Sequence, residues 1–124
     1  MPGWSTTSGA QLNQWTRNGG ANQQWRHTTA PDGTCTLTNV NSGQLVDVQG
    51  NASADGTPII QWPAHGGPNQ RWRQVPTDGG YAKFVSVSTG KVLGVAGNAT
   101  TDGAKIVEQT DTGDLSQQWL IAPV

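Results

Sequence analysis

The sequence has 124 residues, which is long enough for one domain with a hydrophobic core and too short for two. Seven basic residues stand against eight acidic ones, for a net charge of −1 with neither sign clustered, so no nucleic-acid partner is expected. No apolar run is long enough to span a bilayer, and no membrane partner is expected either. Cys35 is the only cysteine, which excludes an intrachain disulfide and metal sites built from paired cysteines. We expect no metal and no cofactor.

Short apolar runs alternate with turns along the whole chain, and this spacing predicts an all-β fold. The alternating runs lie, in chain order, at 34–40, 44–48, 81–87 and 91–95. In each of them every second side chain can face a core. Asp-Gly turn signals occur at 31–33, 54–56, 77–80 and 101–103. No stretch has a sustained helical period, so the helix content is expected to be close to nil.

The sequence repeats itself with a period of 47 residues. A Gln-x-Trp motif occurs three times, and its tryptophans, Trp25, Trp72 and Trp119, are 47 residues apart. Residues 49–72 align with 96–119 without a gap. Three copies of a unit with several short strands predict threefold pseudosymmetry. A closed barrel of three lobes fits this best, because closure removes exposed sheet edges.

We expect one domain over residues 1–124, with a partial lobe one at 1–30, lobe two at 31–77 and lobe three at 78–124. Three full units would need 141 residues, and the missing 17 correspond to the opening strand pair of lobe one. In lobe two this segment supplies the expected core residues Leu37, Val40 and Val46. We therefore expect either that the natural protein carries such a strand pair upstream of Met1, or that two chains form a homodimer that covers the incomplete lobe.

The three Gln-x-Trp motifs, each preceded by a Gly-rich loop, and the segment GQLVDVQG at 43–50 resemble the ricin-B-type β-trefoil, also classed as carbohydrate-binding module family 13. The resemblance covers essentially the whole chain. It implies four strands per lobe around a shared core that contains the three repeated tryptophans. The glutamine of each motif is expected to fix loop backbone or a neighbouring carboxylate. Leu45 and Ala64 stand where many members have a disulfide, so stability must come from packing.

The resemblance also implies a sugar-binding site made of a strand Asp, an aromatic residue about fifteen positions later and the Asn before Gln-x-Trp. Lobe two has all three, as Asp47, Trp62 and Asn69. An indole face can stack on the C–H face of a pyranose, while carboxylate and amide groups take paired hydroxyls. Three neighbouring residues are further candidate contacts, with the glutamine expected to orient the Asp: Gly50, His65 and Gln70.

The other two lobes depart from this pattern. At the three site positions lobe three has Gly94, Gln109 and Ser116, so the carboxylate, the stacking face and the amide are all missing. Lobe one keeps Trp15 and Asn22, but Met1 already aligns with the residue after the Asp. The sequence therefore predicts a complete sugar site in lobe two, an incomplete site in lobe one and no binding in lobe three. The expected ligand is a mono- or oligosaccharide of the galactose, xylose or arabinose type.

Simpler roles remain open for the candidate site residues. Trp62 could pack on its hairpin, Asp47 could cap a turn, and His65 could be an ordinary loop residue. Most carboxylates fall in turns and no catalytic spacing stands out, so we expect no catalytic residues and no enzyme activity. Two functions then remain: a sugar-binding module of a secreted, extracellular glycan-active protein, or a trefoil whose loops grip another protein as an inhibitor does.

Overall fold

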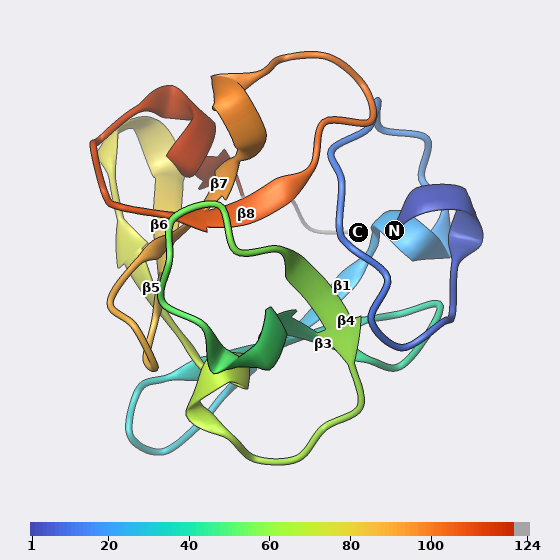
Figure 1. The fold of residues 1–124 in the computed structure, drawn as a ribbon, viewed down its shortest axis with the longest axis horizontal. Helices are drawn as coiled ribbons and strands as arrows, with labels where there is room; N and C mark the ends of the chain where they lie inside the picture. Colours follow the sequence, from blue (N-terminus) through green and yellow to red (C-terminus); the bar gives the residue numbers. More distant parts are fainter. Residues whose placement is uncertain (121–124) are drawn as a thin grey trace.

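Nine short strands form one antiparallel sheet in the computed structural model, which describes residues 1–120 (Figure 1). The strands are β1 (Trp25–Thr29), β2 (Cys35–Asn39), β3 (Leu45–Val48), β4 (Ile59–Trp62), β5 (Trp72–Pro76), β6 (Tyr81–Ser86), β7 (Val92–Val95), β8 (Ile106–Gln109) and β9 (Trp119–Leu120). The helical elements in these residues are single 3₁₀ turns: η1 (Pro2–Trp4), η2 (Ala21–Gln23), η3 (Gln49–Asn51), η4 (Pro68–Gln70), η5 (Asp78–Gly80), η6 (Ala96–Asn98) and η7 (Leu115–Gln117). None of the helical turns in this part of the chain is long or apolar enough to cross a membrane.

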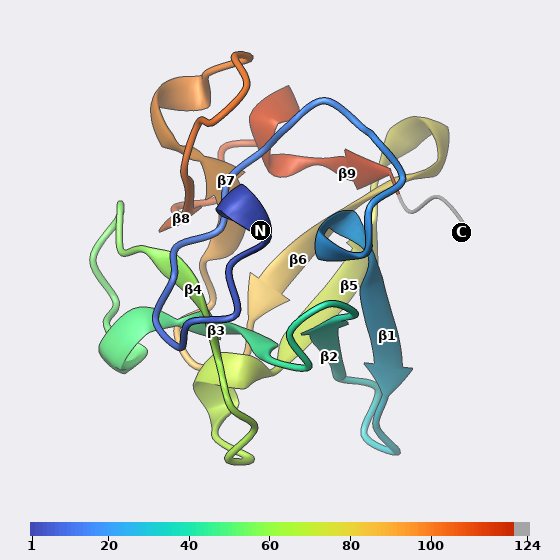
Figure 2. The same cartoon turned by 90° about the vertical axis from the view of Figure 1, so that its right-hand side faces the viewer.

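The strand pairing repeats with the sequence period. The first and fourth strands of a lobe meet at Cys35 and Trp72 in lobe two and at Ala82 and Trp119 in lobe three. The fourth strand of one lobe also forms a hairpin with the first strand of the next, as β1 does with β2 and β5 with β6 (Figure 2). This arrangement is the threefold pseudosymmetric β-trefoil that the sequence predicted.

The three repeated tryptophans differ in burial. Trp72 is 0% exposed, and its indole N–H donates to the carbonyl of Val46 at 3.2 Å. Trp25 and Trp119 are half-buried and pack against the edge of the same core. Trp72 has strand partners on both sides, Cys35 and Ser86, whereas Trp25 and Trp119 each have one among the described residues. The predicted core role is therefore complete for Trp72 and partial for the other two.

The core prediction is wrong for one of the three residues named in the opening strand pair of lobe two. Val46 is buried and Leu37 packs against the core, but Val40 is 44% exposed. The reason is the strand alternation, because Asn39 takes the inward position at the end of β2 and the next side chain must point outward. Cys35 is a buried free thiol in this strand, as expected of a small apolar residue.

Two repeat-equivalent glutamines, the buried Gln61 and the half-buried Gln14, join neighbouring lobes. The Gln61 amide nitrogen donates to the carbonyls of Ser5 and Thr7, both at 3.0 Å, and its oxygen accepts from the Ser42 hydroxyl at 2.7 Å. Gln14 makes the equivalent pair of bonds to lobe three, at 3.0 and 2.9 Å. The side-chain N–H₂ group thus donates hydrogen bonds to two carbonyls of the adjacent loop. Glutamine suits this position because its amide nitrogen has two donors.

Lobe three has a carboxyl group, Glu108, at the same position. Its Oε1 accepts from the Thr89 hydroxyl at 3.0 Å, as Gln61 Oε1 accepts from a hydroxyl in lobe two. Its Oε2 stands where glutamine has the N–H₂ group and, among the described residues, is buried without a hydrogen-bond partner. Burial raises the pKa of Glu108, and the hydroxyls of Thr89 and Thr57 and the charge of Lys91 oppose that rise only in part. We therefore expect a protonated Glu108 over a range of pH in which an ordinary carboxyl is ionised.

Glu108→Gln is expected to stabilise the fold by about 1–3 kcal/mol at neutral pH, because the new N–H₂ group can donate to the loop as in the other lobes. The raised folded-state pKa means that the unfolded chain loses its proton first. The wild type should then lose stability as the pH rises above the ordinary value of 4.5, until the folded form also titrates. Urea unfolding from about pH 4 to pH 8 measures this. A variant with the same pH slope and midpoints as the wild type would contradict it.

Candidate functional site

The carboxylate of the predicted site is buried at the end of β3. Asp47 is 3% exposed and pairs with Ile60 across the β3–β4 hairpin. Its Oδ1 accepts from the Asn69 side chain at 3.1 Å and its Oδ2 from the Gln70 side chain at 2.9 Å. Asn69 also donates to the carbonyl of Val48 at 3.2 Å. The η4 turn therefore brings both amides against the carboxylate, and three of the predicted residues lie in direct contact.

The electrostatics of Asp47 reflect this burial. Desolvation raises the pKa of Asp47, while the amides of Gln70 and Asn69 and the nearby His65 work in the opposite direction. The His65 side chain is 42% exposed, and its Nε2 lies 3.6 Å from Asp47 Oδ2. An ionised carboxylate has about four lone-pair sites, so the two amides leave capacity for further donors. Such a carboxylate can accept hydrogen bonds from the hydroxyl groups of a ligand.

The motif glutamines clamp the loop before them in every lobe. Gln70 accepts from the backbone N–H of His65 at 3.1 Å and donates to the carbonyl of Pro63 at 2.9 Å. Gln23 and Gln117 make the same two bonds to the residues five and seven positions earlier. The prediction that these glutamines fix loop backbone is confirmed, as is the orienting contact of Gln70 with the Asp47 carboxylate.

The aromatic candidate lies on the rim rather than in the core. Trp62 is the last residue of β4 and is 43% exposed. Its ring packs on Gly9, where an added Cβ would lie 3.7 Å away, and Trp15 of lobe one packs on Gly103 in the same way. Gly50 is exposed in the η3 turn that follows β3, with a φ of 61°. A ligand contact of Gly50 stays a prediction.

In lobe three one side chain fills the space that the site occupies in lobe two. Gln109 folds onto Gly94, where even a Cβ atom would collide with it. Its Oε1 accepts from the Gln117 side chain at 3.0 Å, as the Asp47 carboxylate accepts from Gln70. Its Nε2 donates to the carbonyl of Val95 at 3.0 Å, which is the bond that the motif Asn makes in lobe two. The pairing of Gly94 with Gln109 in the sequence indicates the loss of the site, but it does not predict that the glutamine side chain fills the space.

The site asparagine of lobe one makes the same backbone hydrogen bond as its equivalent in lobe two. Asn22 is 6% exposed, and its Nδ2 donates to the carbonyl of Met1 at 2.9 Å, the equivalent of the Asn69 bond to β3. The Asn22 Oδ1 is buried and has no hydrogen-bond partner within residues 1–120. Trp15 is 59% exposed. The structure therefore holds an aromatic platform and an unsatisfied amide oxygen in lobe one.

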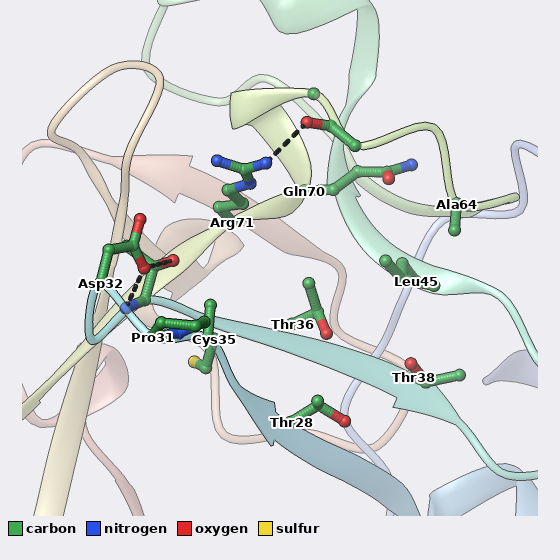
Figure 3. Close-up of a pocket in the computed structure, with 14 residues that line it drawn as sticks. Thr28, Pro31, Asp32, Cys35, Thr36, Thr38, Leu45, Ala64, Gln70 and Arg71 are labelled. Carbon is green, nitrogen blue, oxygen red and sulfur yellow. Dashed lines mark hydrogen bonds between the residues drawn. The ribbon is translucent and has the colours of Figure 1, made fainter.

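A hollow lies beside this cluster rather than over it, and Figure 3 shows the residues that line it. It has a volume of about 680 Å³, is mainly apolar, and lies between the β1–β2 hairpin and the loop of residues 64–67. Arg71 at its rim donates to the carbonyl of Gly66 at 3.2 Å. Gln70 lines it, but Asp47, Trp62 and Asn69 do not. We assign the candidate site to the Asp47 cluster, because a carboxylate and two amides converge there and a pyranose site can be shallow.

Similarity to known proteins decides the family. A family model of ricin-type β-trefoil lectin-like domains matches residues 1–62 and 68–124. The chain belongs to the ricin-type β-trefoil lectin family. The Gln-x-Trp repeat, the three lobes and the family match therefore agree. A search of curated proteins found no match.

Several solved structures share this trefoil. The designed threefold-symmetric protein ThreeFoil is 37% identical with a TM-score of 0.97, over 99% of this chain and 88% of its own. An exo-β-1,3-galactanase from Clostridium thermocellum is 36% identical with a TM-score of 0.94, over 97% of this chain. The chain spans 26% of that enzyme. A Polyporus squamosus lectin, solved with a sialylated galactose-containing epitope, is 29% identical with a TM-score of 0.66, over 77% of this chain and 34% of its own.

Proposed function

We propose that the protein is a non-catalytic carbohydrate-binding module with its main site in lobe two. The family match and the lectin neighbours support carbohydrate binding in general. The observation that carries the site assignment is the Asp47 carboxylate, held by Asn69 and Gln70 on the strand that pairs with the strand of the exposed Trp62. The ligand class is a neutral pyranoside or furanoside of the galactose, xylose or arabinose type.

Binding in this site combines stacking with directional hydrogen bonds. The exposed Trp62 indole takes the apolar C–H face of the sugar, which leaves the hydroxyls of the ring edge free to point at Asp47. Two adjacent hydroxyls donate to the carboxylate at the lone pairs that the amides leave free. The His65 imidazole lies at the exposed edge of Asp47, so a hydroxyl reaches Oδ2 by contacting or displacing that ring. The backbone clamp of Gln70 holds the loop while the imidazole moves.

We propose the setting of a secreted glycan-active protein. The chain corresponds to 26% of the galactanase that it resembles, which is the arrangement of a module attached to a larger enzyme. Residues 1–120 contain no cluster of three or more acidic, histidine or cysteine side chains able to hold a metal. The proposed binding role rests on the Asp47 cluster.

Titration with free sugars tests the proposal. Calorimetry or NMR with galactose, lactose, xylose and arabinose should give weak binding for at least one, near the millimolar range that corresponds to about 4 kcal/mol. A glycan array first narrows the choice of sugar. No binding to any glycan, together with tight binding of a partner protein, would instead favour the inhibitor function that the trefoil fold also supports.

The homodimer stays a proposal. The half-buried Trp25 and Trp119 and the exposed Leu120 are apolar groups that a second chain or a further strand pair would cover. Sedimentation at several protein concentrations separates the outcomes. A mass that rises with concentration supports association, and a monomer of constant mass that unfolds cooperatively contradicts it.

A further inference from the structure

The hollow beside the candidate site is open because two side chains that cross the equivalent space in lobe three are small in lobe two. In lobe three the Lys83 ammonium reaches from β6 to Asp111 in the loop before η7, and the two groups form an ion pair at 2.6 Å. The repeat-equivalent residues of lobe two are Thr36 and Ala64, and both line the hollow. These short side chains do not bridge strand and loop, so a volume of about 680 Å³ stays open.

The hollow continues from the proposed stacking residue. Leu45, which lines the hollow, pairs directly with Trp62 across the β3–β4 hairpin. Residues directly opposite on paired strands have side chains on the same face, with Cβ atoms about 5 Å apart. Ala64, at the same end of the hollow as Leu45 in Figure 3, follows Trp62 by two positions. A ligand that stacks on Trp62 can therefore extend into the hollow with its next sugar unit.

Arg71 is the cation at the rim of the hollow, and the loop beside it does not need an arginine. The Arg71 guanidinium donates to the carbonyl of Gly66 at 3.2 Å (Figure 3). The equivalent residues Gln24 and Gln118 make the same bond to the equivalent glycines, also at 3.2 Å. A glutamine amide is therefore sufficient to hold this loop. The arginine adds a positive charge and four further N–H donors to lobe two.

Arg71 has no carboxylate partner within residues 1–120. The ion pairs of this part of the chain involve lysine and histidine side chains instead. Asp32 is the other charged residue that lines the hollow, but its carboxylate accepts from the backbone N–H and the hydroxyl of Thr34, at 3.0 and 2.6 Å. An exposed guanidinium with free donors suits a planar carboxylate, which it can bind through two parallel hydrogen bonds.

We propose that the hollow of lobe two is a subsite for a uronic acid unit whose carboxylate binds Arg71. This inference rests on the proposed function, because the uronic acid is the unit next to the neutral sugar on Trp62. The apolar lining contacts the C–H groups of the acidic ring, and the guanidinium takes its carboxylate. The ligand class of lobe two is then an acidic oligosaccharide. Lobes one and three have glutamine at the position of Arg71 and lack this group.

Calorimetry with matched disaccharides tests the subsite. The pairs are galactosyl-galactose with glucuronosyl-galactose and xylobiose with glucuronosyl-xylose, so that each pair offers the same sugar to Trp62. We expect the acidic member of at least one pair to bind about tenfold more tightly than its neutral member. The difference should shrink at high salt, because ions screen an exposed charge pair. The methyl ester of the acidic disaccharide should bind like the neutral one.

The neutral and acidic arms separate the two proposals. Equal binding of both members in each pair that binds would overturn the subsite and leave the proposed function intact. No binding of any disaccharide, with no binding of the free sugars, would overturn both.

Arg71→Gln is the matched variant, because glutamine holds the same loop in the other two lobes. It should remove the preference for the acidic disaccharide and leave the binding of the neutral one unchanged. Arg17→Gln removes the same charge from the equivalent loop of lobe one and should keep the preference. If Arg71→Gln also keeps it, the carboxylate does not bind Arg71 and the proposal is wrong.

The double variant Thr36→Lys, Ala64→Asp builds the ion pair of lobe three across the hollow without changing the net charge. It should lose the preference for the acidic disaccharide, while a free neutral sugar binds as it does to the wild type. An unchanged preference in the filled variant would show that the hollow is not the subsite. If the double variant does not fold, Arg71→Gln still decides the question.

Discussion

Trp62→Ala is expected to abolish measurable sugar binding in lobe two while the protein stays folded. The indole is 43% exposed and is the proposed stacking face, so its removal should leave only hydrogen bonds that compete with water. A site near the millimolar range has about 4 kcal/mol in total, and losing the aromatic contact consumes most of it. Thermal unfolding should change by no more than the roughly 1 kcal/mol that is usual for a partly exposed position.

Gln109→Ala is the control for this loss. Gln109 has the position equivalent to Trp62, but its side chain closes the space in lobe three with its own hydrogen bonds. Its replacement should leave the lobe-two titration unchanged. Unchanged binding in Trp62→Ala, or a loss of binding as large in Gln109→Ala, would show that the main site lies elsewhere.

Trp72→Ala is expected to lower the free energy of unfolding by about 3–5 kcal/mol, the usual cost of emptying a large aromatic core position. The Trp72 side chain is fully buried, and the hydrogen bond from its indole N–H to the carbonyl of Val46 would be lost with it. A domain of this size has about 5–15 kcal/mol in total, so the variant should be close to its folding limit. Urea unfolding followed by circular dichroism measures the change.

Trp25→Ala provides the comparison for Trp72. Both tryptophans have the same repeat position, but Trp25 is half-buried and has one strand partner among the described residues. We therefore expect a smaller loss of stability than in Trp72→Ala. An unfolded Trp62→Ala together with a stable Trp72→Ala would reverse the assignment of rim and core tryptophans.

The repeat made the fold and most of the site predictable from sequence. A 47-residue period with three Gln-x-Trp motifs predicts similar strands and turns at equivalent positions, because each unit has the same pattern of apolar and turn residues. The contact of Asp47 with Asn69 and Gln70 also follows from the family pattern, since each residue lies at a fixed position in its lobe. Local periodicity and repeated spacing were therefore sufficient to predict the fold and the contacts of Asp47.

Only the tertiary structure decided which groups fill the space at each repeat position. The collapse of Gln109 onto Gly94 depends on a missing Cβ on a neighbouring strand, and the packing of Trp62 on Gly9 depends on a contact between lobes two and one. The oxygens of Asn22 and Glu108 that have no hydrogen-bond partner within residues 1–120 can be identified only once their surroundings are known. A sequence repeat states which positions are equivalent. Hydrogen bonding and packing across the lobes determine what each equivalent position does, because those contacts join residues that no local pattern relates.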